Sequence, residues 1–144
     1  MTRDCIVVTG ASRGIGAAIA IALAKRGHDV ACLSRSATLP AHADVSPEVT
    51  ARWSAWQVDV SEPASLAEAF RRIAADGRRI SGLVNNAGLH VDAPSAEMPL
   101  EQWHRVIDMN ATSVVTASQA AVGAIPIANP STRWHNDVNR FVYE

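Results

Sequence analysis

The stretch Thr9-Gly10-Ala11-Ser12-Arg13-Gly14-Ile15-Gly16 decides the fold of this chain. It lies between a β-branched, strand-like run at residues 5–9 and a segment of helical periodicity that begins at residue 15. Gly10 permits a sharp turn off the strand, and Gly14 lets backbone N–H groups approach a pyrophosphate. Gly16 lets the following helix pack close to the sheet. The positive end of the helix dipole then faces the phosphates.

The spacing of the glycines is Gly-x₃-Gly-x-Gly, and such a triplet can also be a tight turn with close helix packing. Its surroundings favour the phosphate loop. The helix is predicted to bury one apolar face, made of Ile15, Ile19, Ala22 and Leu23, and to stop at Gly27. Residues 29–34 form a second strand, so strand, helix and strand make a βαβ unit.

Further strands and helices alternate along the chain. A short helix near residues 48–52, capped by Ser46, precedes a strand at residues 54–58. Ser61 or Pro63 opens an amphipathic helix that buries Leu66, Phe70 and Ile73. After a fourth strand at residues 80–84, one long helix runs from residue 100 to about residue 122, marked by Trp103, Val106, Ile107, Val114 and Ala117.

This alternation predicts an α/β protein with a Rossmann-type doubly wound parallel sheet, truncated after about four strands. Residues 1–122 form its dinucleotide-binding domain. Residues 123–144 are an atypical tail, predicted to be irregular, in which Pro126 and Pro130 and half of the chain's six asparagines gather. We expect this tail to be a frameshifted, intron-derived or recombined end.

Composition excludes several classes of protein. The chain has 144 residues, a formal net charge of -1 and 48% hydrophobic residues, which argues against nucleic-acid binding and against a polybasic membrane anchor. No apolar run reaches the roughly 20 residues of a membrane-spanning helix, and the start does not resemble a signal peptide. Cys5 and Cys32 are expected to be reduced, the localisation cytoplasmic, and metal sites absent.

The end of the second strand indicates which cofactor the loop would take. An Asp or Glu at this position would bind a free ribose 2′-hydroxyl, whereas an arginine would accommodate a 2′-phosphate. The sequence here reads Ser34-Arg35, with no acid, and Arg13 can approach the same phosphate from the glycine loop. Each arginine alone could be a solvated surface residue, but together they favour NADP over NAD.

Four ordered motifs carry a resemblance to a known family. They are residues 9–16, Asp59-Val60, Asn85-Asn86-Ala87-Gly88 and Met109-Asn110-Ala111-Thr112. Together they resemble the short-chain dehydrogenase/reductase family over residues 1 to about 122, and most of all its NADPH-dependent 3-oxoacyl-(acyl carrier protein) reductase-like members. The resemblance implies hydride transfer between NADP(H) and a carbonyl or alcohol substrate.

The resemblance also implies roles for individual residues. The pyrophosphate would be held by Gly10, Gly14, Gly16 and the backbone at Ile15, and the adenosine phosphate by Ser12, Arg13 and Arg35. Asp59 would bind the adenine amino group beside Val60, although it could instead cap the next helix. Asn85, Ala87 and Gly88 would shape the floor under the adenosine ribose and the nicotinamide, although Asn85 and Asn86 could be turn residues that satisfy sheet-end backbone.

Asn110 resembles the family's helix-kinking asparagine, which supports a proton relay, although it could be an ordinary polar residue of the helix. The family's acid is a tyrosine paired with a lysine four residues later. This chain has one lysine, Lys25, and one tyrosine, Tyr143, which is followed only by Glu144. Since these two residues cannot form that pair, we expect no hydride transfer by the chain alone.

Three interpretations of function remain open. The chain is the amino-terminal half of an NADP-dependent short-chain oxidoreductase, a non-catalytic NADP(H)-binding module, or a truncated gene-model fragment that neither folds nor binds. In the first, the family resemblance implies homo-oligomers formed through the helix of residues 103–122. The substrate would be a small carbonyl or alcohol compound.

Overall fold

The strand-like runs of the sequence form one parallel sheet. The structure is a computed structural model that describes residues 3–41 and 44–124. Its strands are β1 (Arg3–Thr9), β2 (Asp29–Ser34), β3 (Trp53–Gln57) and β4 (Arg78–Val84), in the order β3-β2-β1-β4. All three pairings are parallel, with Cys5 opposite Asp29 and Val8 opposite Val84. The predicted α/β class and the four-stranded parallel sheet are confirmed.

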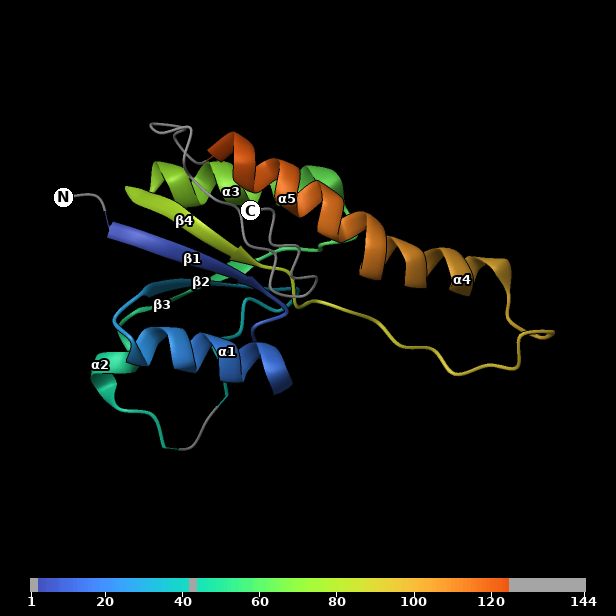
Figure 1. Cartoon of the computed structure of the whole chain (residues 1–144), viewed down its shortest axis with the longest axis horizontal. Coiled ribbons are helices and arrows are strands. Elements are labelled where there is room, and N and C mark those ends of the chain that lie inside the picture. Colours follow the sequence, from blue (N-terminus) through green and yellow to red (C-terminus); the bar gives the residue numbers. More distant parts are fainter. Residues whose placement is uncertain (1–2, 42–43, 125–144) are drawn as a thin grey trace, which may run out of the picture.

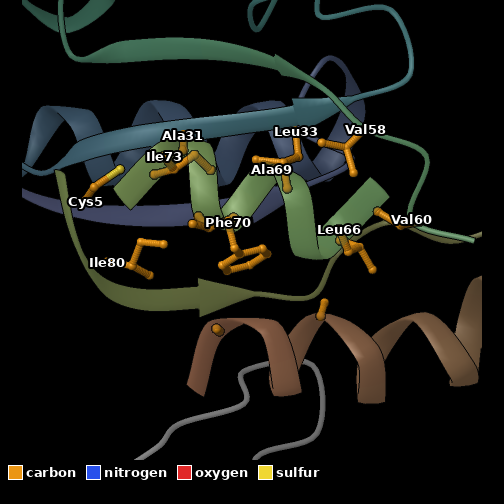
Figure 2. Close-up of a cluster of buried hydrophobic side chains, with 13 residues drawn as sticks. Cys5, Ala31, Leu33, Val58, Val60, Leu66, Ala69, Phe70, Ile73 and Ile80 are labelled. Carbon is orange, nitrogen blue, oxygen red and sulfur yellow. The ribbon is translucent and has the colours of Figure 1, made fainter. Parts of the chain in front are cut away.

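Helices cover both faces of this sheet, as the doubly wound fold requires (Figure 1). One face carries α1 (Gly14–Lys25) and the short α2 (Pro47–Thr50), and the other carries α3 (Pro63–Ala75) and α5 (Ser113–Ala124). Successive strand side chains alternate between the faces, so Cys5 and Val7 point to one cluster and Val8 to the other. Figure 2 shows the α3 side, where Phe70, Leu66 and Ile73 lie against β1, β2 and β4.

The predicted apolar face of α1 is wrong for Ile15 and Ala22 and right in part for Ile19 and Leu23, which pack against a buried cluster. Ile15 is 75% exposed and Ala22 is exposed, while Ile19 and Leu23 are only partly buried. The face that contacts the sheet is instead a stripe of mostly small residues, Gly16, Ala17, Ala20, Ile21 and Ala24. Periodicity weighted toward large side chains missed most of this stripe, because the close approach of α1 to the sheet at Gly16 favours small residues there.

Two other helices follow their sequence patterns. In α3, which begins at Pro63, the buried residues include the predicted Leu66, Phe70 and Ile73. The helix expected near residues 48–52 is α2, with Ser46 at its N-cap position, but Ser46 makes no capping hydrogen bond from its side chain.

The long helix predicted from residue 100 is present but is not uniform. It consists of α4 (Leu100–Ile107), a π-helical turn η1 (Asp108–Thr112) and α5. Figure 1 shows α4 extending away from the sheet, and none of its residues is buried. The π-turn contains Asn110, the residue expected to kink the helix.

The tail predicted to be irregular lies outside the described residues, except for Gly123 and Ala124, which end α5. Among the residues that the structure describes, no helix is long and apolar enough to cross a membrane.

Candidate cofactor-binding site

A pocket of about 430 Å³ lies where the strands end at their carboxyl edge. Parallel sheets bind ligands at this edge, beside the point where the strand order reverses, which here lies between β1 and β4. The pocket is lined by Gly10, Ser12, Arg13, Gly14, Ile15, Gly16, Leu33, Ser34, Arg35, Val58, Asp59, Val60, Asn86, Ala87, Gly88, Leu89, Arg105 and Met109. It therefore brings together all of the cofactor-site residues predicted from sequence except Asn85.

The glycine loop forms the wall of the pocket nearest to β1. A Cβ atom added to Gly16 would overlap the carbonyl oxygen of Gly10, so only glycine allows α1 to begin this close to the strand. Gly14 has a φ of +57°, and a Cβ atom added there would meet nothing within 4 Å, so its backbone faces open space. The predicted close packing at Gly16 is confirmed.

The first turn of α1 faces the pocket without a side-chain cap. Arg13, at the N-cap position, has an extended backbone and makes no capping hydrogen bond from its side chain. The backbone N–H group of Ala17 donates to Arg13 O at 3.3 Å, whereas the first N–H groups of a helix have no acceptor within it. Those N–H groups and the helix dipole provide a site that fits a phosphate anion.

A second hollow of about 620 Å³ adjoins the first one at the end of β2 and shares four of its residues. Its lining holds two guanidinium groups and four hydroxyl groups and no carboxylate: Ser12, Arg13, Ser34, Arg35, Ser36 and Thr38. The loop is held by a hydrogen bond from the Thr38 N–H to Ser34 Oγ at 3.2 Å. Such a donor set fits a phosphate and offers no acceptor of the kind that a free ribose 2′-hydroxyl prefers.

Asp59 lies after β3, on the same side of the pocket as Arg35. Its Oδ1 accepts hydrogen bonds from the Ser61 hydroxyl at 2.6 Å and from the Ser61 N–H at 3.0 Å. The hydroxyl bond lowers the pKa of Asp59 from 3.8, and the nearby Arg35 charge lowers it further. Asp59 thus forms a turn before α3, whose N-cap position is occupied by Glu62 and not by Asp59, and it also lines the pocket. Val60 is buried in the core cluster next to it.

The segment after β4 is tied to β1 by the side chains of Thr9 and Asn86. The Thr9 hydroxyl accepts the N–H groups of Asn86 and Ala87, both at 3.0 Å, and Asn86 Nδ2 donates to the carbonyls of Thr9 and Gly10. The alternative that an asparagine satisfies sheet-end backbone thus describes Asn86. Its neighbour Asn85 is buried and donates to Ser118 Oγ on α5 at 3.3 Å, away from the pocket.

Asn110 joins the helical arm to the loop after β4. Its Oδ1 accepts the Leu89 N–H at 2.8 Å, and its Nδ2 donates to the Leu89 carbonyl at 2.7 Å. A Cβ atom on Gly88 would lie 3.0 Å from this Oδ1, so Gly88 leaves room for the clamp. Asn110 itself does not line the pocket, but Met109 and Arg105 from the same arm do. Met109 belongs to one of the four motifs but was given no role there, and no pattern in the sequence singled out Arg105.

Comparison with known proteins agrees with this geometry. A family model described as short chain dehydrogenase matches residues 4–129. The chain belongs to the short-chain dehydrogenase family. The resemblance found in the four motifs is thereby confirmed, and the match extends beyond residue 122, where the resemblance was expected to end.

Individual relatives in the short-chain dehydrogenase family match at moderate identity. The chain is 40% identical over 110 residues to a 2-dehydro-3-deoxy-D-gluconate 5-dehydrogenase of Pseudoalteromonas atlantica, covering 74% of this chain and 43% of that protein. It is 38% identical over 119 residues to the Escherichia coli 3-oxoacyl-(acyl-carrier-protein) reductase, covering 83% of this chain and 48% of that one.

Solved structures of the family show the same fold. An aldohexose dehydrogenase of Thermoplasma acidophilum superposes with a TM-score of 0.71 at 31% identity, covering 86% of this chain and 45% of that one. A blue fluorescent protein from a metagenomic library, in complex with NADPH, gives 0.70 at 30% identity, covering 87% of this chain and 52% of that one. The chain thus spans about half the length of these family members.

Among the residues that the structure describes, none in the pocket lining is a counterpart of the family's tyrosine–lysine pair. Lys25 is the last residue of α1, whereas the pocket is lined by the first turn of that helix. Tyr143 lies outside the described residues. Within residues 3–41 and 44–124, no three His, Cys, Asp or Glu side chains are grouped so that they could hold a metal ion.

Proposed function

We propose that residues 1–122 form the NADP(H)-binding part of a short-chain oxidoreductase. The observation that carries this proposal is the pair of adjoining hollows beside the α1 N-terminus. Arg13 and Arg35 line both hollows, and the lining of the hollow at the end of β2 contains no carboxylate. NADP(H) carries a pyrophosphate and a 2′-phosphate, and the two hollows offer a site for each. The solved relative that contains NADPH supports the same cofactor.

Each part of the cofactor would meet its own group of residues. The glycine loop with Ile15 would hold the pyrophosphate, and Ser12, Arg13 and Arg35 would surround the 2′-phosphate. Asp59 would accept a hydrogen bond from the adenine amino group, with Val60 beneath it. Ala87 and Gly88 would form the floor toward the nicotinamide, and Asn85 would support that floor from behind through its bond to Ser118.

The bound cofactor would supply or accept a hydride, so the protein has to hold the substrate and deliver the proton. Asn110 would contribute by fixing the Leu89 backbone beside the pocket. The substrates for which relatives are named include a sugar acid and an acyl thioester, so the relationship supports a small carbonyl or alcohol substrate without choosing among them.

The proposal is tested by titrating the pure chain with NADPH and with NADH and following cofactor fluorescence. We expect NADPH to bind about tenfold more tightly or better, because charge-assisted hydrogen bonds to the 2′-phosphate are lost with NADH. Arg35→Asp should abolish this preference, whereas Arg71→Asp should keep it, since Arg71 pairs with Glu68 on α3 outside the pocket. Equal affinities of the wild-type chain for the two cofactors would contradict the proposal.

A second candidate is a non-catalytic NADP(H)-binding module, favoured by the phosphate-binding geometry at the start of α1 and by the position of Lys25 at the opposite end of that helix. Incubating the 144-residue chain with NADPH and a panel of ketones distinguishes the two. We expect cofactor binding without turnover by this chain alone. Turnover that persists in Lys25→Ala would show that catalysis proceeds without the family's pair.

Homo-oligomerisation through the helix of residues 103–122 is part of the same proposal. It is supported by the exposure of apolar side chains along that helix, with Trp103 51% exposed and Val115 57% exposed. Sedimentation analysis of the chain and of Trp103→Gln should show association that weakens in the variant.

A further inference from the structure

Arg105 is a charged residue that the cofactor does not account for. It comes from α4 and lines the pocket beside Leu89 and Met109. The ion pairs among the described residues involve Arg3, Arg52, Arg71, Arg78, Arg79 and His90, but not Arg105. Within this part of the chain, the guanidinium group of Arg105 thus has no carboxylate partner, although it faces a pocket.

The charges in the pocket are divided between its two ends. Four charged side chains line it: Arg13, Arg35, Asp59 and Arg105. Arg13 and Arg35 follow β1 and β2, next to the hollow proposed for the 2′-phosphate. Asp59 lies near them, since the charge of Arg35 contributes to lowering its pKa. Arg105 lies instead at the end formed by the loop after β4 and the helical arm. It is the one charged side chain that the described residues place at that end.

The position of Arg105 is held by neighbouring contacts. Asn110 clamps both backbone polar groups of Leu89, so the arm and the loop after β4 meet at a defined place. Arg105 lies in the last turn of α4, directly before the π-turn that carries Met109 and Asn110, and it lines the pocket together with Met109. The clamp therefore brings Arg105 to the pocket wall.

We propose that Arg105 binds a carboxylate of the substrate, so that the substrate is a small carbonyl or alcohol compound that also carries a carboxylate. This inference rests on the proposed function, in which Gly88 and Leu89 lie at the nicotinamide end. Cofactor phosphates already have the α1 N-terminus, Arg13 and Arg35 at the other end. The planar guanidinium fork of arginine matches the two oxygens of a carboxylate in a bidentate pair.

The experiment uses the full chain loaded with NADP⁺ and two probes of similar size at constant ionic strength, levulinate and neutral 2-pentanone. Nitrogen-15 NMR of the arginine Nε–Hε groups reports binding at Arg105 itself. We expect levulinate to shift the Arg105 signal saturably and to bind about tenfold more weakly, or worse, to Arg105→Gln. The neutral ketone should not distinguish the two proteins.

Arg71→Gln is the matched control, because it removes an exposed arginine outside the pocket and should leave levulinate binding unchanged. Equal binding of levulinate to the wild-type chain and Arg105→Gln would overturn the inference. Tighter binding of hydroxyacetone phosphate than of levulinate would overturn the carboxylate assignment.

Cofactor affinity separates this inference from the proposed function. NADPH should bind Arg105→Gln within about twofold of the wild-type chain, because no phosphate of the cofactor reaches this end. A loss of NADPH affinity as large as in Arg35→Asp would make Arg105 a cofactor ligand and overturn the inference. A wild-type chain that binds no NADPH would refute the proposed function, whereas NADPH binding without levulinate selectivity would refute only the role of Arg105.

Discussion

Helices α1 and α4 both contribute to the same pocket, but they are held in different ways. α1 buries Gly16, Ala17, Ala20, Ile21 and Ala24 against the sheet. α4 buries no residue, and its Leu100 and Trp103 side chains are 67% and 51% exposed. One side of the pocket is therefore bounded by a helix packed along its length. The other side is bounded by an arm that extends away from the sheet (Figure 1) and is held by the Asn110 clamp and by Met109, which packs against the core.

The two ends of the pocket are therefore held by different kinds of contact. The phosphate end depends on backbone atoms in close contact, so changes there disturb the sheet as well as the site. The α4 end depends on contacts of the π-turn, chief among them the exposed Asn110 clamp, so loss of the clamp should open the pocket locally while leaving the core intact. Both expectations can be tested by substitution.

The largest effect is expected for Gly16→Ala. The new Cβ would overlap the Gly10 carbonyl group, which is backbone and cannot move away without shifting the loop, and it would also crowd the Asn86 side-chain nitrogen. We expect a loss of about 3 kcal/mol or more in the free energy of unfolding, at the upper end for overpacking, together with loss of NADPH binding. Urea unfolding followed by circular dichroism measures the first, and cofactor fluorescence the second.

Gly123→Ala is the control for this substitution, since a Cβ at Gly123 meets nothing within 4 Å. It should stabilise α5 slightly, by about 0.5 kcal/mol, because alanine has the higher helix propensity. If Gly16→Ala were as stable as the wild-type chain, the phosphate end of the pocket would not depend on close backbone contact between α1 and the loop after β1.

A smaller and more local effect is expected for Asn110→Ala. It removes two hydrogen bonds to the Leu89 backbone in an exposed region, for a cost of about 1 kcal/mol. Amide exchange at Leu89 and in the π-turn should accelerate, while exchange in β1 and β2 stays unchanged. Gln119→Ala, an exposed change on α5, should alter neither. Acceleration throughout the sheet in Asn110→Ala would show that the arm supports the core.

The smallest effect concerns pH at the packed end of the pocket. The pKa of Asp59 lies below 3.8 because the Ser61 hydroxyl donates to its carboxylate. A carboxyl group with a lowered folded-state pKa stabilises the fold fully above its unfolded-state pKa and loses that contribution as the pH falls through its folded-state pKa. Ser61→Ala should raise the Asp59 pKa toward its ordinary value and reduce this acid dependence. Carbon-13 NMR titration of the carboxyl group measures the change, and an unchanged pKa would contradict the assigned cause.

The accuracy of sequence-based prediction followed the range of the interactions involved. The strands, the face of α3 and the glycine loop were predictable, because each depends on local periodicity or on glycine. The buried face of α1 was not, since large residues suggested one stripe and close contact with the sheet selected another. The role of Thr9 was not predicted, because its hydroxyl bonds to residues 77 and 78 positions away in the sequence. For Asn86 the sequence suggested a turn residue that satisfies sheet-end backbone, but not its bonds to the carbonyls of Thr9 and Gly10.

The sequence by itself determined the family, the parallel α/β architecture and the position of the phosphate loop, because ordered motifs and alternating periods encode these within short segments. Only the tertiary structure placed Arg105 and Met109 on the pocket wall and turned Asn85 away from it toward Ser118. Those positions arise where the arm after β4 meets the sheet edge. The position of the arm against the sheet edge depends on contacts between segments far apart in the sequence, and a local pattern of residues does not predict such contacts.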